Sequence, residues 1–148
     1  MVFNGRVRPW RVVFSGLHFI GHDPSDYTMS EVMLSRSTRY LWAAARGKAD
    51  SGYGGYLSCF LLDDDGFILK KMFTVSTGNT GGTASSISPA PWDDEWLALS
   101  DSVSGYVQLW RMKGGKQTDA GIDYSTAEPM ARVDIFDGGC CSNALWYN

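Results

Sequence analysis

Two side chains of opposite charge, Glu31 and Arg46, lie at the borders of neighbouring apolar segments of this 148-residue chain. A guanidinium binds a carboxylate through paired hydrogen bonds, and a glutamate can hold that guanidinium in place or transfer a proton. The same two residues are also compatible with a structural salt bridge, and Arg46 alone could extend from a turn into solvent. The elements that carry them decide between a functional site and a surface pair.

The glycine-rich stretch STGNTGGTASSISPAPW, residues 76–92, is the second candidate for chemistry. Gly81 and Gly82 suggest a phosphate-binding loop, but such a loop needs a lysine and a following helix, and neither is indicated here. We therefore interpret the stretch as a connection between two strands, in which the glycines let the backbone turn. The hydroxyl groups of Thr83 and Ser85 either contact a ligand or satisfy turn backbone.

Short runs rich in valine, isoleucine and aromatic residues alternate with clusters of Gly, Asp, Ser and Pro, and helical periodicity is nearly absent. This pattern is typical of an all-β fold. The dipeptide Asp65-Gly66 predicts a tight hairpin turn, because glycine tolerates the positive φ that such a turn requires. We expect strands at residues 11–20, 31–35, 40–45, 55–62, 67–75, 84–88, 96–100, 106–112, 131–136 and 142–147.

The predicted strands form two groups with the same order of signals, offset by roughly fifty residues, which is the period of propeller blades. The matching positions are Tyr40-Leu41-Trp42 with Trp96-Leu97-Ala98, Gly55-Tyr56 with Gly105-Tyr106, and Leu34-Ser35 with Ile87-Ser88. Each group is expected to form one four-stranded antiparallel blade of a β-propeller. A small β-sandwich is the alternative, and it explains the strands but not the repeat.

We predict a single partial propeller domain over residues 1–148, in which two complete blades occupy residues 31–75 and 84–136. An outer strand of a preceding blade is expected at residues 11–20, and an inner strand of a closing blade at residues 142–147. Closed propellers have about four to eight blades, so two blades alone would leave apolar faces uncovered. The chain is therefore expected to be part of a larger propeller or to self-associate through those faces.

Antiparallel connectivity predicts where polar residues gather, because the start of a first strand and the end of a second strand lie at the same rim. Glu31 is expected at such a start and Arg46 at such an end. Equivalent positions surround the mouth of the central channel, where propellers bind small ligands, and they hold Gly82, Thr83, Ser85, Asp101 and Asn143. The hydroxyl and amide groups among them could instead bond turn backbone, and Asp101 is expected to be a turn residue.

The composition and charge of the chain limit its partners. The net charge of -3 comes from mixed charges without a long basic run, which argues against nucleic acid or an anionic membrane. No apolar stretch reaches about 18 residues and no signal segment is indicated, so we expect a soluble cytoplasmic protein. An odd cysteine count, with Cys140 and Cys141 adjacent, predicts reduced thiols. His18 and His22 lie in a turn and are not expected to bind metal.

Four motifs carry a resemblance to a known family: EVMLSRSTRYLWAAARG, TGGTASSISPAPWDDEWLALSD, GYVQLWRMK and SNALWYN. They resemble the C-terminal blades of the fungal 3-carboxy-cis,cis-muconate lactonizing enzymes, the carboxymuconate cyclases, which are seven-bladed propellers. The resemblance covers residues 27–148. Bacterial propeller-type 6-phosphogluconolactonases share a more distant version of the same pattern.

The resemblance implies a cycloisomerase of the β-ketoadipate pathway, in which a carboxylate of 3-carboxy-cis,cis-muconate adds to a double bond and closes a lactone. It implies no metal and no organic cofactor. Arg46 matches the family's arginine and would bind a substrate carboxylate, while Glu31 would orient that arginine or act as an acid. Gly82, Thr83, Ser85 and Asn143 would contact substrate.

One departure from the family pattern concerns Thr83, which stands where the fungal relatives tend to carry histidine. A threonine hydroxyl can hydrogen-bond a substrate but cannot donate a proton near neutral pH as imidazole can. The sequence therefore leaves open whether this chain is itself an active enzyme. The alternatives are a propeller lactonase that hydrolyses a sugar-type lactone and a non-catalytic propeller module that binds a small ligand.

Overall fold

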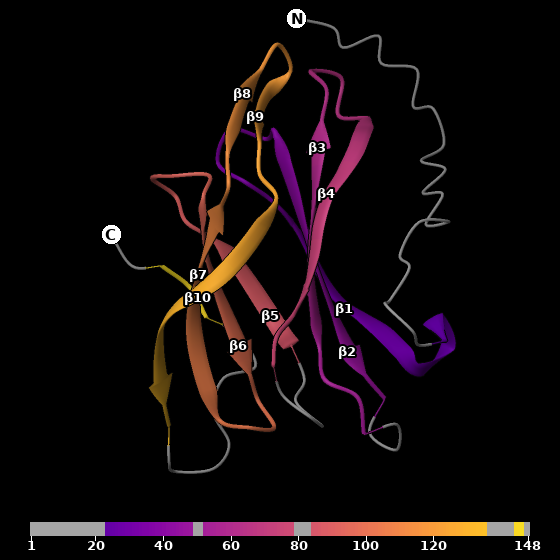
Figure 1. Ribbon diagram of the computed structural model, residues 1–148. Helices are drawn as coiled ribbons and strands as arrows, with labels where there is room; N and C mark the ends of the chain where they lie inside the picture. Colours follow the sequence, from indigo (N-terminus) through magenta and orange to yellow (C-terminus); the bar gives the residue numbers. More distant parts are fainter. Residues whose placement is uncertain (1–22, 49–51, 79–83, 136–143, 147–148) are drawn as a thin grey trace, which may run out of the picture.

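The computed structural model describes residues 23–48, 52–78, 84–135 and 144–146, and it shows two four-stranded antiparallel sheets (Figure 1). A short 3-10 helix, η1 (Pro24–Asp26), precedes the first sheet. The first sheet has the strand order β1-β2-β3-β4 and consists of β1 (Tyr27–Leu34), β2 (Tyr40–Gly47), β3 (Tyr56–Leu62) and β4 (Ile68–Ser76).

The second sheet repeats this arrangement with one insertion. Its strand order is β10-β7-β6-β5, and its members are β5 (Ala84–Pro89), β6 (Trp96–Asp101), β7 (Tyr106–Lys113) and β10 (Thr126–Asp134). Two short strands between β7 and β10 form a separate hairpin, namely β8 (Lys116–Thr118) and β9 (Gly121–Asp123). Both sheets are therefore antiparallel meanders of the kind that a propeller blade contains.

The all-β prediction is confirmed, and the repeat is visible in the strand boundaries. Tyr40 and Trp96 begin the second strands of the two sheets, and Tyr56 and Tyr106 begin the third strands. The predicted turn at Asp65-Gly66 is also confirmed, because Gly66 has φ +84 and its amide donates to the carbonyl oxygen of Asp63. The sequence alignment of the two units therefore holds for their second and third strands.

The proposed match of Leu34 with Ile87 is displaced by two residues. Leu34 pairs with Leu41, whereas the residue that pairs with the equivalent Leu97 is Pro89. The predicted strand at residues 11–20 lies outside the described residues. Of the predicted strand at residues 142–147 only 144–146 are described, and these are not in a strand.

Two strands begin earlier than predicted, and each contains a β-bulge. β1 begins at Tyr27 rather than Glu31, and its register with β2 shifts between Met29 and Glu31. β10 begins at Thr126, and its register with β7 shifts at Pro129, where the outer edge of the sheet tolerates a residue without an amide proton. Each bulge is visible only as a shift in register against the partner strand. The sequence pattern of one strand alone does not reveal it.

The two sheets pack face to face around one apolar cluster. Trp42, Leu57 and Leu97 have no exposed surface, and the cluster also includes the buried Tyr106 and Trp110 of β7. Burial alternates strictly along β7, so that every second side chain points toward the first sheet. Trp42 and Trp110 therefore pack in the apolar core between the two sheets.

The β8–β9 hairpin ties the second sheet to the first. Arg39 donates hydrogen bonds to the Asp64 carboxylate and to the carbonyl oxygen of Ala120, and Lys70 forms an ion pair with Asp123. Figure 1 shows the hairpin projecting from the ends of β7 and β10. Its short polar strands carry no apolar alternation, which is why the sequence did not predict it.

Replacing Trp42 by alanine is expected to lower the free energy of unfolding by about 3–5 kcal/mol, because it leaves a large cavity between the sheets. Trp42 is fully buried, and its ring meets the Phe73 ring edge-on with the ring centroids 5.8 Å apart. Chemical denaturation followed by circular dichroism measures the change. Val103→Ala is the control, since Val103 is 69% exposed and its truncation should change stability by less than about 0.5 kcal/mol. Equal effects of the two substitutions would contradict the assigned packing.

Candidate active-site rim and inter-sheet pocket

Glu31 lies inside β1, directly after the bulge, and its carboxylate reaches the second sheet. Its Oε2 accepts hydrogen bonds from the Ser86 hydroxyl and from the Ile87 backbone amide of β5, both at 2.7 Å. Hydrogen bonds to a charged acceptor are about twice as strong as neutral ones. Glu31 thus joins the first strands of the two sheets, β1 and β5.

Arg46 is the last residue but one of β2 and is exposed. It pairs with Thr28 across the β1–β2 ladder, while Glu31 pairs with Ala44. Because side chains alternate along a strand, Glu31 and Arg46 share the face that points toward the second sheet. No salt bridge joins them, and within the described residues the guanidinium of Arg46 has no hydrogen-bond or ion-pair partner. Its side chain is therefore exposed at the end of β2, away from the carboxylate of Glu31.

The remaining residues predicted at this rim are only partly described. Gly82, Thr83 and Asn143 lie outside the described residues, and Ser85 is described only as the second residue of β5. Asp101 is fully buried, and its Oδ1 accepts hydrogen bonds from the two amides that follow it in the β6–β7 turn, those of Val103 and Ser104. Asp101 is the last residue of β6, and its carboxylate stabilises the turn that follows, in line with the turn role predicted for it.

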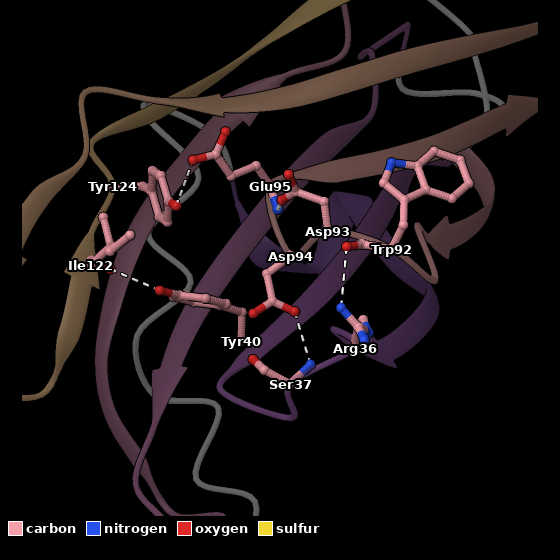
Figure 2. Close-up of a pocket in the computed structure, with 9 residues that line it drawn as sticks. All are labelled: Arg36, Ser37, Tyr40, Trp92, Asp93, Asp94, Glu95, Ile122 and Tyr124. Atoms are coloured by element: carbon pink, nitrogen blue, oxygen red, sulfur yellow. Dashed lines mark hydrogen bonds between the residues drawn. The ribbon is translucent and has the colours of Figure 1, made fainter.

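A pocket of about 600 Å³ lies at the opposite end of the strands, where the two sheets and the segment after β9 meet. Figure 2 shows its walls, which are residues 36–37 of the β1–β2 turn, residues 92–95 of the β5–β6 turn, Tyr40, Ile122 and Tyr124. Tyr40 begins β2 and Arg46 is near its end, so the pocket and the predicted rim are separated by about 20 Å of strand.

Two tyrosines and a glutamate form the inner wall of the pocket. The Tyr124 hydroxyl donates to Glu95 at 2.8 Å, and the Tyr40 hydroxyl donates to the Ile122 carbonyl oxygen at 3.1 Å. The two tyrosine rings meet edge-on with centroids 5.7 Å apart. Burial, together with the carboxylate of Glu95, raises the pKa of Tyr124 above its ordinary value, and burial also raises the pKa of Tyr40.

This pocket was not predicted, although the amino-acid sequence contains one feature that points to it. Three consecutive acidic residues, 93–95, follow an exposed tryptophan in the β5–β6 turn. Such a run is ordinarily a solvated turn, and only the tertiary packing of Tyr40 and Tyr124 beside it creates a concave surface.

Neither metal chemistry nor thiol chemistry finds support in the described part of the chain. No group of three or more histidine, cysteine or carboxylate side chains there could hold a metal ion. Cys59 is a free, fully buried thiol, and burial raises its pKa, so it remains protonated at neutral pH. Cys140 and Cys141 lie outside the described residues.

No helix in the described ranges is long and apolar enough to cross a membrane.

The architecture thus defines an all-β protein with propeller-like blades. Comparison with known proteins shows which enzymes the chain is related to. No protein-family model matches the sequence. The chain is 32% identical over 122 residues to the carboxy-cis,cis-muconate cyclase of Neurospora crassa. The match covers 82% of this chain and 30% of the cyclase. The chain is therefore a homologue of a segment of this enzyme, and the resemblance to the fungal carboxymuconate cyclases is confirmed.

Substitution of Glu31 tests whether its carboxylate holds the two sheets together. Glu31→Ala leaves a backbone amide and a hydroxyl without their acceptor and is expected to cost about 1–3 kcal/mol of unfolding free energy. Glu31→Gln keeps an acceptor oxygen and should cost less than half as much. Glu128→Ala, at an exposed position of β10, is the control and should change stability by less than about 0.5 kcal/mol. If the two alanine variants were equally stable, Glu31 would not be an inter-sheet tie.

The buried tyrosines predict a loss of stability at high pH. Burial raises the pKa of Tyr27 to about 12, whereas tyrosine in an unfolded chain titrates near 10. Between these values the folded state binds more protons than the unfolded state, so the free energy of unfolding falls as the pH rises from about 10 to 12. Denaturation at a series of pH values measures the slope. Tyr27→Phe combined with Tyr124→Phe should flatten it, and an unchanged slope would contradict the assignment.

Proposed function

We propose that this chain provides part of the active site of a lactonizing cycloisomerase that acts on 3-carboxy-cis,cis-muconate in the aromatic catabolism of the cytoplasm, within the β-ketoadipate pathway. The observation that carries the proposal is the 32% identity to the Neurospora crassa cyclase. The chain spans 30% of the length of that enzyme, so the activity of the whole protein is part of the proposal.

In this proposal Arg46 binds a carboxylate of the substrate. Its guanidinium is exposed, shares the face of Glu31 and has no partner among the described residues. A tricarboxylate needs such a partner, because ring closure brings one carboxylate oxygen against a carbon of the double bond while the others must be held apart. The new C–O bond uses an electron pair of that oxygen, and the π electrons of the double bond move to the neighbouring carbon, which takes up a proton from water or from a residue of the other blades.

We assign Glu31 to positioning rather than to proton transfer. Its Oε2 is already engaged by the Ser86 hydroxyl and the Ile87 amide, so the carboxylate holds β5 beside the strand that carries Arg46. Gly82, Thr83, Ser85 and Asn143 are proposed to contact substrate at the same rim. The hydroxyl of Thr83 would bind substrate without protonating it.

The similarity to one segment of a longer enzyme also supports a larger assembly. We propose that the two sheets are two blades of a seven-bladed propeller, whose other blades contribute further substrate contacts. In their absence the outer sheet faces would favour self-association, since Val32, Leu34 and Val133 are exposed apolar side chains of β1 and β10.

Activity measured on the chain, and on a protein in which it is joined to further blade repeats, tests the proposed reaction. Loss of diene absorbance from 3-carboxy-cis,cis-muconate should follow addition of active protein. Arg46→Ala should lower kcat/KM by about 100-fold, the effect of removing one preorganised charged donor. Arg132→Ala is the control, because Arg132 is an exposed arginine of β10 paired with Asp134, and this substitution should leave the rate unchanged.

Two other outcomes would indicate a different function, and a third would change the role of Arg46. Turnover of a preformed lactone alone would replace the cycloisomerase by a propeller lactonase. A folded, complete propeller that turns over neither compound would be a binding module. Equal rates for the Arg46→Ala and wild-type proteins would remove Arg46 from the active site.

A further inference from the structure

We propose that the pocket between the two sheets is a second ligand site, which binds a small organic cation, namely an ammonium or guanidinium group attached to an apolar ring. The pocket has a volume of about 600 Å³, within the range of small-molecule sites. It is assembled from both sheets and from the segment after β9, so it exists only in the folded chain (Figure 2).

The carboxylates of the pocket are not all consumed by internal bonds. Glu95 is fully engaged, because one oxygen accepts from Tyr124 and the other pairs with Arg111 at 2.9 Å. Asp94 uses Oδ1 to accept from the Ser37 amide at 2.8 Å, and Asp93 uses Oδ1 to accept from the Glu95 amide at 2.7 Å. In the described part of the chain, the second oxygen of each aspartate has no hydrogen-bond partner, which leaves two acceptors for a ligand.

The balance of charge favours a cation over an anion. Arg36 is the one cationic side chain among the pocket walls, and its guanidinium donates to the Trp92 carbonyl oxygen at 3.3 Å. Because Arg111 already neutralises the charge of Glu95, two aspartates remain against one arginine, and the net charge of the pocket walls is negative. A carboxylate-rich substrate of the kind proposed for the Arg46 rim would be repelled here, so this pocket serves a different ligand.

Aromatic walls decide between an organic cation and a metal ion. The rings of Tyr40 and Tyr124 line the pocket, and the Trp92 indole at its mouth is 53% exposed. Faces of aromatic rings attract ammonium and guanidinium groups and provide apolar contact for the rest of the molecule. The carboxylates do not converge in the way that a metal requires, because the described residues contain no group that could hold one.

Binding of benzylamine, with benzyl alcohol and benzoate as its neutral and anionic counterparts, tests the proposal. Titrations followed by amide chemical shifts should give saturable changes at Ser37 and Glu95 with a Kd of about 1 mM for benzylamine. The two counterparts should bind at least about tenfold more weakly. Added salt should weaken benzylamine binding, because part of the attraction is Coulombic.

Variants separate the pocket from the rest of the surface. Asp94→Asn keeps an oxygen for the Ser37 amide but removes the charge, and it should weaken benzylamine about fivefold or more, as should Asp93→Asn. Asp65→Asn, in the exposed β3–β4 turn, should have no effect. The proposal is overturned if benzylamine does not saturate, if benzyl alcohol binds equally well, or if neither pocket variant differs from Asp65→Asn. None of these readouts depends on muconate turnover, so each proposal can fail alone.

Discussion

Trp42, Leu57 and Leu97 lose all contact with water only because the two four-stranded sheets pack face to face. Each sheet alone would expose a row of large apolar side chains, and burial of such groups contributes about 1.5–3 kcal/mol apiece. Everything else in the structure depends on this packing. It sets the distance between β1 and β5, which Glu31 bridges, and it brings residues 92–95 beside Tyr40, which creates the pocket.

The polar contacts between the sheets fix how the sheets are positioned relative to each other. Apolar packing alone specifies this less strictly, because it has no preferred direction. At one end Glu31 fixes β5 against β1 through two hydrogen bonds. At the other end Arg39 and Lys70 hold the β8–β9 hairpin against the first sheet. As a result the strand ends differ in charge: the exposed guanidinium of Arg46 lies near one end, and the carboxylates of Asp93 and Asp94 line the pocket at the other.

This separation bears on how the chain could be used. The chain is similar to a segment of a carboxymuconate cyclase, and in the proposed reaction Arg46 would bind a carboxylate of the substrate. The pocket at the other end is lined by carboxylates and aromatic rings, which suit a ligand of the opposite sign. A blade-like unit can carry both because antiparallel strands bring successive turns to alternate ends of the sheet.

Most strands were predictable because their signals are local. The alternation of apolar residues in β7 and the glycine at the Asp65-Gly66 turn act within a few residues of chain, and the repeated spacing of Tyr40 and Trp96 reveals the second unit. The early start of β1 was not predictable, since the bulge before Glu31 exists only in its register with β2. The β8–β9 hairpin was missed because its stability comes from Arg39 and Lys70, which lie in other elements.

The amino-acid sequence by itself determined the all-β class, the repeated four-strand unit and the kinship to the carboxymuconate cyclases, and it singled out Arg46 as the proposed anion-binding residue. Those properties depend on residue type and spacing along the chain. The tertiary structure alone decided that Glu31 bonds to β5 rather than to Arg46, and that three turn carboxylates and two tyrosines line an open pocket. Hydrogen bonds and cavities depend on atoms brought together from distant segments, and no local pattern in the sequence encodes their distances.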